Sequence, residues 1–307
     1  MHAKSATLKT VLMSACLCLI TWILPFARAQ QHDADHKQFL AYKAGAESHE
    51  AEAQNNLGKC FHDGRGVAKD ARAAVEWFGK AAAQGYAVAQ DNLGQCYATG
   101  DGVEKDAAVA ANWFRKAADQ GCAPAQYNLA QCYRDGSGVK QDYAEAVKWY
   151  QKAADQNLGP AQANLGACFA NGHGVKKDYA EAVRWYRKAA EQGVASAQYG
   201  LGLCYANAQG LAKDDTEAVK WLRAVAEQNY SPAQSALGLC YYNGQGVVKD
   251  YAEAYAWFYL ARSSDSKAVT YREALAHKMS PEQIAEGVRR ARKLEDQIKA
   301  EPSNVGK

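Results

Sequence analysis

Six cysteines recur at a constant spacing of 36 residues, at Cys60, Cys96, Cys132, Cys168, Cys204 and Cys240. Thiols can form disulfides, bind metals or act as nucleophiles, and several of them in a secreted protein ordinarily suggest disulfides. Each of these six, however, lies in an apolar stripe at helical spacing. Equivalent helices of adjacent repeats pack about 8–10 Å apart, whereas the Cα atoms of a disulfide lie within about 7 Å. We therefore predict buried, reduced thiols that pack as small hydrophobic side chains.

The remaining groups that could do chemistry are few and scattered. Cys122 lies in an expected loop between repeats, where it could react or pair between molecules. A group of histidines and aspartates near the N-terminus could bind a metal ion or form a solvated polar tail, and we favour the tail, at His32, Asp33, Asp35 and His36. The chain has no Gly-x-Ser-x-Gly, Walker A or dinucleotide-binding glycine pattern. The sequence therefore predicts no catalytic residue, no cofactor and no metal site.

The first 29 residues differ in composition from the rest. Lys4 and Lys9 precede an apolar run and the small-x-small pattern Ala27-Arg28-Ala29, which predicts a secretory signal peptide cleaved after Ala29 and a periplasmic or extracellular chain with no membrane span. The alternative is an uncleaved anchor, for which the run is short and Pro25 unfavourable. Cleavage removes three basic and no acidic residues, so the formal charge of +3 falls to zero. We expect no nucleic-acid partner.

The elements that carry these residues are copies of one unit. Tryptophans follow the same period, at Trp77, Trp113, Trp149, Trp185, Trp221 and Trp257. A fixed period indicates one supersecondary unit that is copied and stacked, so that each copy buries its apolar face against the next. Each copy contains two helical stripes, such as Ala125, Leu129 and Cys132, then Ala146 and Trp149, and we expect the tryptophans in the core. Alignment on the cysteines gives units at 52–87, 88–123, 124–159, 160–195, 196–231 and 232–267.

Turn and capping residues mark the ends of these helices. Gly-x-Gly separates the two helices in five units, because glycine reaches the left-handed φ that a tight reversal requires. The fifth unit has Ala208-Gln209-Gly210, which predicts an altered or strained turn. An aspartate should cap the start of each second helix, at Asp70, Asp106, Asp142, Asp178, Asp214 and Asp250. Each second helix should end at a residue that tolerates the left-handed conformation, at Gly85, Gly121, Asn157, Gly193, Asn229 and Asp265.

The pattern A-x-x-x-L-G-x-x-[YF]-x-x-G-x-G-V-x-x-D-x-x-x-A-x-x-W-[YF]-x-x-A-A-x-x-[GN] resembles the Sel1-like repeat, a relative of the tetratricopeptide repeat. The fourth unit matches it throughout, from Ala161 through Leu165, Gly166 and Trp185 to Gly193. The resemblance covers about 41–265. It implies an all-α fold, a right-handed α-solenoid of six 36-residue helix-turn-helix repeats with N- and C-terminal capping helices.

The segments outside the six units have the features of caps. Residues 30–51 contain a degenerate second helix, which leads into Ala53-Gln54 as the first full unit leads into Ala89-Gln90. Residues 268–307 contain two further helical patterns and a tail, and Ser280-Pro281 marks the start of the last helix. We predict that this helix is a cap. The alternative is an amphipathic helix that binds a partner or a membrane surface.

The resemblance implies a monomeric, non-enzymatic scaffold that binds a protein or an extended peptide. In tetratricopeptide arrays, first-helix positions around the Leu-Gly pair line the concave face. Carried onto this chain, they are Asn55, Lys59, His62, Asp91, Gln95, Tyr127, Gln131, Arg134, Tyr199, Leu203, Leu239 and Tyr242. A second row could bind a peptide backbone or hold adjacent helices together, at Asn56, Asn92, Asn128 and Asn164. The alternative function is a secreted cell-wall binder or β-lactam-hydrolysing enzyme, although the relatives with that association carry paired cysteines and this chain has one per repeat.

Overall fold

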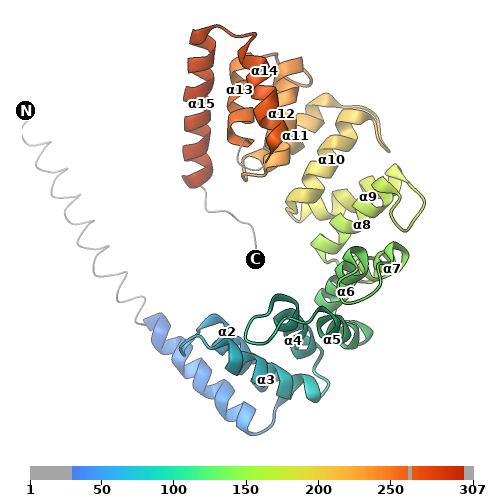
Figure 1. Ribbon diagram of the computed structural model, residues 1–307, viewed down its shortest axis with the longest axis vertical. Helices are drawn as coiled ribbons and strands as arrows, with labels where there is room; N and C mark the ends of the chain where they lie inside the picture. The colour runs from blue at the N-terminus through green and yellow to red at the C-terminus, as the bar shows by residue number, and fades with distance from the viewer. Residues whose placement is uncertain (1–29, 262–264, 301–307) are drawn as a thin grey trace, which may run out of the picture. The chain divides into compact units, whose positions relative to one another are not determined.

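The structure, a computed structural model, describes residues 30–261 and 265–300 (Figure 1). Every regular element in these residues is a helix. Six helix-turn-helix pairs follow one another: α2 (Ala51–Asp63) with α3 (Ala71–Ala83), α4 (Ala87–Thr99) with α5 (Ala107–Asp119), α6 (Ala123–Asp135) with α7 (Tyr143–Asp155), α8 (Gly159–Asn171) with α9 (Tyr179–Glu191), α10 (Ala195–Asn207) with α11 (Asp215–Ala226), and α12 (Ser231–Asn243) with α13 (Tyr251–Ala261). A helix over 30–47 precedes them, and α14 (Ser266–Ala276) and α15 (Pro281–Ala300) follow. The predicted all-α solenoid is confirmed.

The helices form two compact units, which are described separately. Unit 1 holds the described residues up to Cys132 together with 136–140, and unit 2 holds 133–135 and the residues from 141 onward. The predicted signal peptide and its cleavage site lie outside the described residues. No helix in the described part of the chain combines the length and the apolar character needed to span a bilayer.

Five of the six pairs close through a glycine of the first helix and a large side chain of the second, and the third pair has Ala130 at the glycine position. A Cβ on Gly94 would lie 2.7 Å from the Phe114 ring, and one on Gly166 would lie 2.8 Å from the Tyr186 ring. These contacts are closer than a real Cβ allows, so the Leu-Gly pair of the repeat has two separate tasks. The leucine fills the core, as the fully buried Leu165 does, while the glycine admits the ring of the facing helix.

The two glycines of each turn also have separate tasks. The first is the C-cap of the first helix in the left-handed conformation, as at Gly172 with φ 76°. The second passes the preceding pair so closely that a Cβ on Gly210 would lie 2.3 Å from the Tyr179 carbonyl oxygen. Only the first glycine is replaced in the fifth unit, where Ala208 adopts φ 54°. The predicted strain at this turn is therefore confirmed.

The capping predictions hold with one exception. All six aspartates accept a hydrogen bond from a backbone N–H of the first turn of a second helix, as Asp142 does from Glu145 at 2.9 Å. Five of the six predicted helix ends have positive φ, at Gly85, Gly121, Asn157, Gly193 and Asn229. The prediction for Asp265 is wrong. This residue has φ −131° and caps the start of α14 through a bond from the Lys267 N–H, because a further helix begins there.

The tryptophans are only partly core residues. Trp149, Trp185 and Trp257 are buried, whereas Trp77, Trp113 and Trp221 are partly exposed. In four successive pairs a lysine one turn later lies over the ring, as Lys152 Nζ does 3.7 Å from the Trp149 centroid. In these four pairs a cation therefore covers one face of the tryptophan ring.

The helix over 30–47 contacts the first pair as a second helix would. The Gln54 amide donates to the Ala46 carbonyl at 3.2 Å, just as Gln90 donates to Ala82 at 3.2 Å. The close approach of Gly66 to Asp35 O repeats the approach of Gly102 to Ala71 O. The expected polar tail at the N-terminus is therefore part of a helix.

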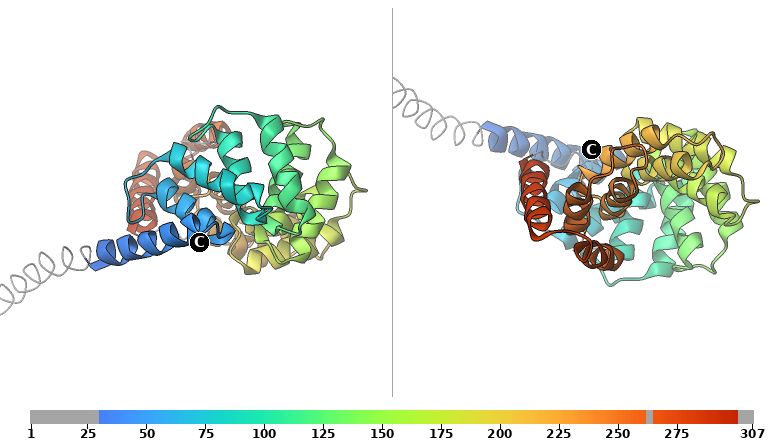
Figure 2. Two further views of the ribbon diagram at one scale, coloured as in Figure 1. Left: turned by 90° about the horizontal axis from the view of Figure 1, so that it is seen from below. Right: turned by 90° about the horizontal axis from the view of Figure 1, so that it is seen from above.

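At the other end of the array, α15 lies beside α13 (Figures 1 and 2). Gly287 permits the close approach, because a Cβ there would lie 3.1 Å from the Ala252 carbonyl oxygen. Arg290 donates to Asp250 at 2.7 Å and to Glu253 at 3.1 Å. Ser280 and Gln283 form the expected reciprocal cap of α15.

Candidate functional site

The twelve residues predicted to line the concave face, here called the row, all lie on first helices. Ten of them reach the surface: Lys59 and Gln95 are exposed, and His62, Tyr127, Gln131, Arg134, Tyr199, Leu203, Leu239 and Tyr242 are partly exposed. The character of the row differs between the two units. In unit 1 its members are polar or charged except for Tyr127, and in unit 2 they are mostly apolar or aromatic.

Two members of the row were wrongly predicted to be surface residues. Asn55 and Asp91 are only 2% and 4% exposed, because they lie where adjacent first helices meet. Asn92 donates to Asn55 Oδ1 at 2.8 Å, and Asn128 donates to Asp91 Oδ1 at 2.8 Å. Of the two interpretations of the asparagine row, these bonds favour the one in which it holds adjacent helices together.

Asp91 is a buried carboxylate stabilised by amides. Its Oδ2 accepts a hydrogen bond from Gln95 Nε2 at 2.8 Å, in addition to the bond from Asn128. Burial raises the pKa of Asp91, and the two amide donors oppose that shift in part. The exposed Gln95 side chain is therefore hydrogen-bonded to the buried Asp91 carboxylate.

A ladder of buried glutamines was not predicted from the sequence. Each donates through Nε2 to a carbonyl eight residues earlier, at Gln54, Gln90, Gln126, Gln162, Gln198 and Gln234. In three pairs a second glutamine 30 residues later donates back to its Oε1, as Gln192 does to Gln162 at 2.8 Å. The signal was present, because these glutamines follow the same 36-residue period. The bonds to these carbonyls link each pair to the second helix before it.

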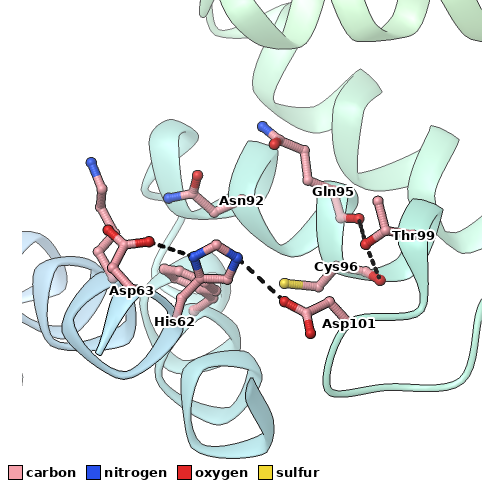
Figure 3. Close-up of a pocket in the computed structure, with 9 residues that line it drawn as sticks. His62, Asp63, Asn92, Gln95, Cys96, Thr99 and Asp101 are labelled. Carbon is pink, nitrogen blue, oxygen red and sulfur yellow. Dashed lines mark hydrogen bonds and ion pairs between the residues drawn. The ribbon is translucent and has the colours of Figure 1, made fainter. Parts of the chain in front are cut away.

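A pocket of about 260 Å³ lies on the row in unit 1, between α2 and α4 (Figure 3). Three row residues, Lys59, His62 and Gln95, line it together with Asp63, Phe78, Asn92, Cys96, Thr99 and Asp101. Figure 3 shows His62 between two carboxylates, with Nδ1 2.7 Å from Asp63 Oδ1 and Nε2 3.3 Å from Asp101 Oδ2. The imidazole thus joins the end of α2 to the turn after α4. In the described part of the chain, no carboxylate lies within 4 Å of the Lys59 ammonium.

One wall of this pocket carries a thiol. The thiol on its wall belongs to Cys96, and burial raises the pKa of that thiol to about 11, so it is protonated at neutral pH. The six cysteines that recur every 36 residues are all buried, and Cys122 is partly exposed. Among the described residues, no three His, Cys, Asp or Glu side chains gather as a metal site. The pocket wall carries the ammonium of Lys59, the imidazole of His62 and two side-chain amides, beside the carboxylates of Asp63 and Asp101.

In unit 2 the row is apolar and aromatic except for Arg134. Tyr199 packs against Tyr230 with ring centroids 5.6 Å apart, and burial raises the pKa of the Tyr199 phenol. Leu239 and Tyr242 pack against the core of α13 and α14. Such partly exposed tyrosines and leucines are suited to apolar side chains of a partner.

A tetrapeptide of the Ser-x-x-Lys type, which supplies the nucleophile in enzymes that act on β-lactams, occurs at Ser137–Lys140. It lies in the turn between α6 and α7, where Ser137 is exposed and its N–H bonds to the Cys132 carbonyl. A second copy, at Ser264–Lys267, begins outside the described residues.

A family profile described as the Sel1 repeat matches the chain six times in succession, at 51–86, 87–122, 123–158, 159–194, 195–230 and 231–266. Each match begins one residue before the unit proposed from the cysteines. No curated protein matches the chain.

Three solved structures are similar to this chain. A Sel1 repeat protein from Oxalobacter formigenes is 38% identical, with 71% of this chain and 89% of that chain covered and a TM-score of 0.65. A protective antigen of uropathogenic Escherichia coli strains is 27% identical over 89% and 76% of the two chains, with a TM-score of 0.39. An immunity protein from Pseudomonas aeruginosa is 25% identical over 71% and 83%, with a TM-score of 0.41.

Proposed function

The chain belongs to the Sel1 repeat family, and we propose that it is a non-enzymatic scaffold that binds a protein or an extended peptide along the exposed residues of the row. Proteins of this family are generally interaction scaffolds. The observation that carries the proposal is the pocket between α2 and α4, because three residues of the row line one recess in which, among the described residues, no carboxylate lies within 4 Å of the Lys59 ammonium. A peptide lying there would meet Lys59 and Gln95 directly.

The contrast between the buried positions and the row positions of the first helices supports this proposal. The buried faces of first helices carry the same residues in every unit, namely a glutamine, a leucine and a cysteine. The row beside them changes from lysine, histidine and glutamine to tyrosine and leucine. Positions that keep the fold are therefore separate from positions that are free to set specificity.

We propose further that the partner lies outside the cytoplasm. The basic start, the apolar run and the Ala27-Arg28-Ala29 pattern support export with removal of the first 29 residues. The intact mass of the protein purified from the native host shows whether the first 29 residues have been removed. A chain that begins at Gln30 is expected, and a full-length chain retained in the membrane fraction would contradict it.

Site-specific photocrosslinking tests the binding surface. The photoreactive residue p-benzoylphenylalanine would replace Lys59 or Gln95 in the pocket, and Glu76 on the exposed side of α3 as a matched control. Row variants should give one discrete adduct in the native host, and the Glu76 variant should not. Adducts from Glu76 alone would place the partner on the second helices and overturn the proposal.

A further inference from the structure

An aromatic and cationic cluster lies at the end of the row in the sixth pair. Tyr242, near the end of α12, stacks on Tyr251 at the start of α13, with ring centroids 5.6 Å apart and planes 26° apart. Lys249, in the loop between them, places Nζ 4.8 Å from the Tyr251 centroid and 5.9 Å from the Tyr242 centroid. Lys278, just after α14, donates from Nζ to the Tyr242 hydroxyl. These four residues are called the Tyr-Lys cluster.

One part of the cluster is a feature of the repeat. Lys177 lies 4.7 Å from the Tyr179 ring in the fourth pair, at the positions equivalent to Lys249 and Tyr251. The other part is particular to the sixth pair. Lys278 lies 36 residues after Tyr242, one full period, so the segment after α14 supplies the row position of a further repeat. The row therefore continues to Lys278.

The positive charge of the cluster is not neutralised locally. In the described part of the chain, no carboxylate lies within 4 Å of Lys249 or Lys278. Lysines elsewhere in unit 2 do have such partners, as Lys148 does with Glu145 at 2.8 Å and Lys220 with Glu217 at 3.1 Å. The hydrogen bond from Lys278 lowers the pKa of the Tyr242 phenol, with Lys249 contributing in the same direction. Two ammonium groups thus lie within 6 Å of the centroid of one partly exposed tyrosine ring.

We propose that the Tyr-Lys cluster is an anion subsite of the row and takes the acidic side chains of a bound peptide segment. This inference rests on the proposed function, because it names the chemistry that one part of the row would recognise. A carboxylate between the two ammonium groups would complete the ion pairs that the chain itself leaves open. The methylene groups of a glutamate could lie on the tyrosine rings, with Leu239 beside them for an apolar neighbour.

Fluorescence anisotropy with the full mature chain tests the subsite. The probes are labelled, C-terminally amidated peptides of equal length and identical leucine and serine content, with glutamate, glutamine or lysine at the same three positions. A fourth probe carries glutamine and a free C-terminal carboxylate. The glutamate peptide should bind tightest, and its advantage should shrink as salt rises. Lys249→Gln and Lys278→Gln should each weaken that binding about threefold, as expected for an exposed ion pair.

A matched control and a charge reversal make the result decisive. Lys267→Gln alters an exposed lysine of α14 outside the cluster and should leave binding unchanged. The double variant Lys249→Glu with Lys278→Glu should bind the lysine peptide better than the glutamate peptide, which no loss of folding could produce. Equal affinity for the glutamate and glutamine peptides would overturn the subsite. If the free-carboxylate probe binds as tightly as the glutamate peptide, the assignment of the subsite to acidic side chains is overturned. The photocrosslinks at Lys59 and Gln95 lie in unit 1, so they report on the proposed function independently of this outcome.

Discussion

Replacement of Ala208 by glycine should stabilise the protein. Ala208 ends α10 with φ 54° and ψ 41°, in the left-handed region where a Cβ costs about 1–2 kcal/mol. Glycine relieves that strain but adds about 0.5–1 kcal/mol of backbone entropy to the unfolded chain. The residue is exposed, so no packing is lost. The net gain should be about 0.5–1 kcal/mol in the free energy of unfolding.

Two glycine variants control for this reasoning, and urea denaturation of all four proteins measures it. Gly172→Ala places a Cβ at the equivalent position, with φ 76°, and should lose about as much as Ala208→Gly gains. Gly210→Ala should cost about 3 kcal/mol or more, because its Cβ would lie 2.3 Å from a carbonyl oxygen as well as requiring φ 74°. A neutral or destabilising Ala208→Gly together with a neutral Gly172→Ala would refute the account of the turn.

Three further predictions concern the interior. Trp149→Ala should cost about 3–5 kcal/mol, because the ring is buried and its N–H donates to Glu145, whereas Trp113→Ala should cost less because that ring is partly exposed; urea midpoints showing equal losses would contradict this. Titration of the mature protein with a thiol reagent should modify at most Cys122 before denaturation and all seven thiols afterwards, and two or more internal disulfides in non-reducing mass analysis would contradict it. Asp91→Asn should raise the free energy of unfolding at neutral pH and change it little in acid. Burial raises the folded-state pKa of Asp91, so the stability that its protonated form contributes is complete below its ordinary pKa and is lost as the pH rises through the raised value. Chemical denaturation of the original protein and of Asp91→Asn from acid to neutral pH measures this difference in the free energy of unfolding. A loss of stability of Asp91→Asn at neutral pH would show that the charge of Asp91 is needed.

Much of the fold can be predicted from the sequence because each repeat contains the same local signals. The aspartate caps, the turn glycines and the apolar stripes agree in every unit, and the replacement at Ala208 could be identified as strained from its position alone. Asp265 was wrongly assigned because it occupies a helix-end position while a further helix begins at Ser266. A repeat pattern carries no information about the element after its last copy.

The candidate site was harder to predict, since surface exposure depends on neighbours one period away. Asn55 and Asp91 are at row positions, but Asn92 and Asn128 of the next first helices bond to them and cover them. The pattern within one repeat does not show which residues of adjacent repeats form these hydrogen bonds. Likewise, the repeat pattern does not show which tryptophans are partly exposed, and the extension of the row to Lys278 depends on where α14 ends.

The affinity of the crosslinked partner for row variants tests the central claim most directly. Tyr199→Ala and Arg134→Ala should each weaken binding by about 1–3 kcal/mol, as truncation of anchoring aromatic and arginine side chains usually does, without altering helical content. Loss of the contact with Tyr230 should lower the melting midpoint of Tyr199→Ala, so its affinity is measured well below that midpoint. Arg289→Ala changes an exposed residue of α15 and should leave the affinity unchanged. If both row variants bind normally and Arg289→Ala abolishes binding, the partner docks on α15 and the row is not the interaction surface.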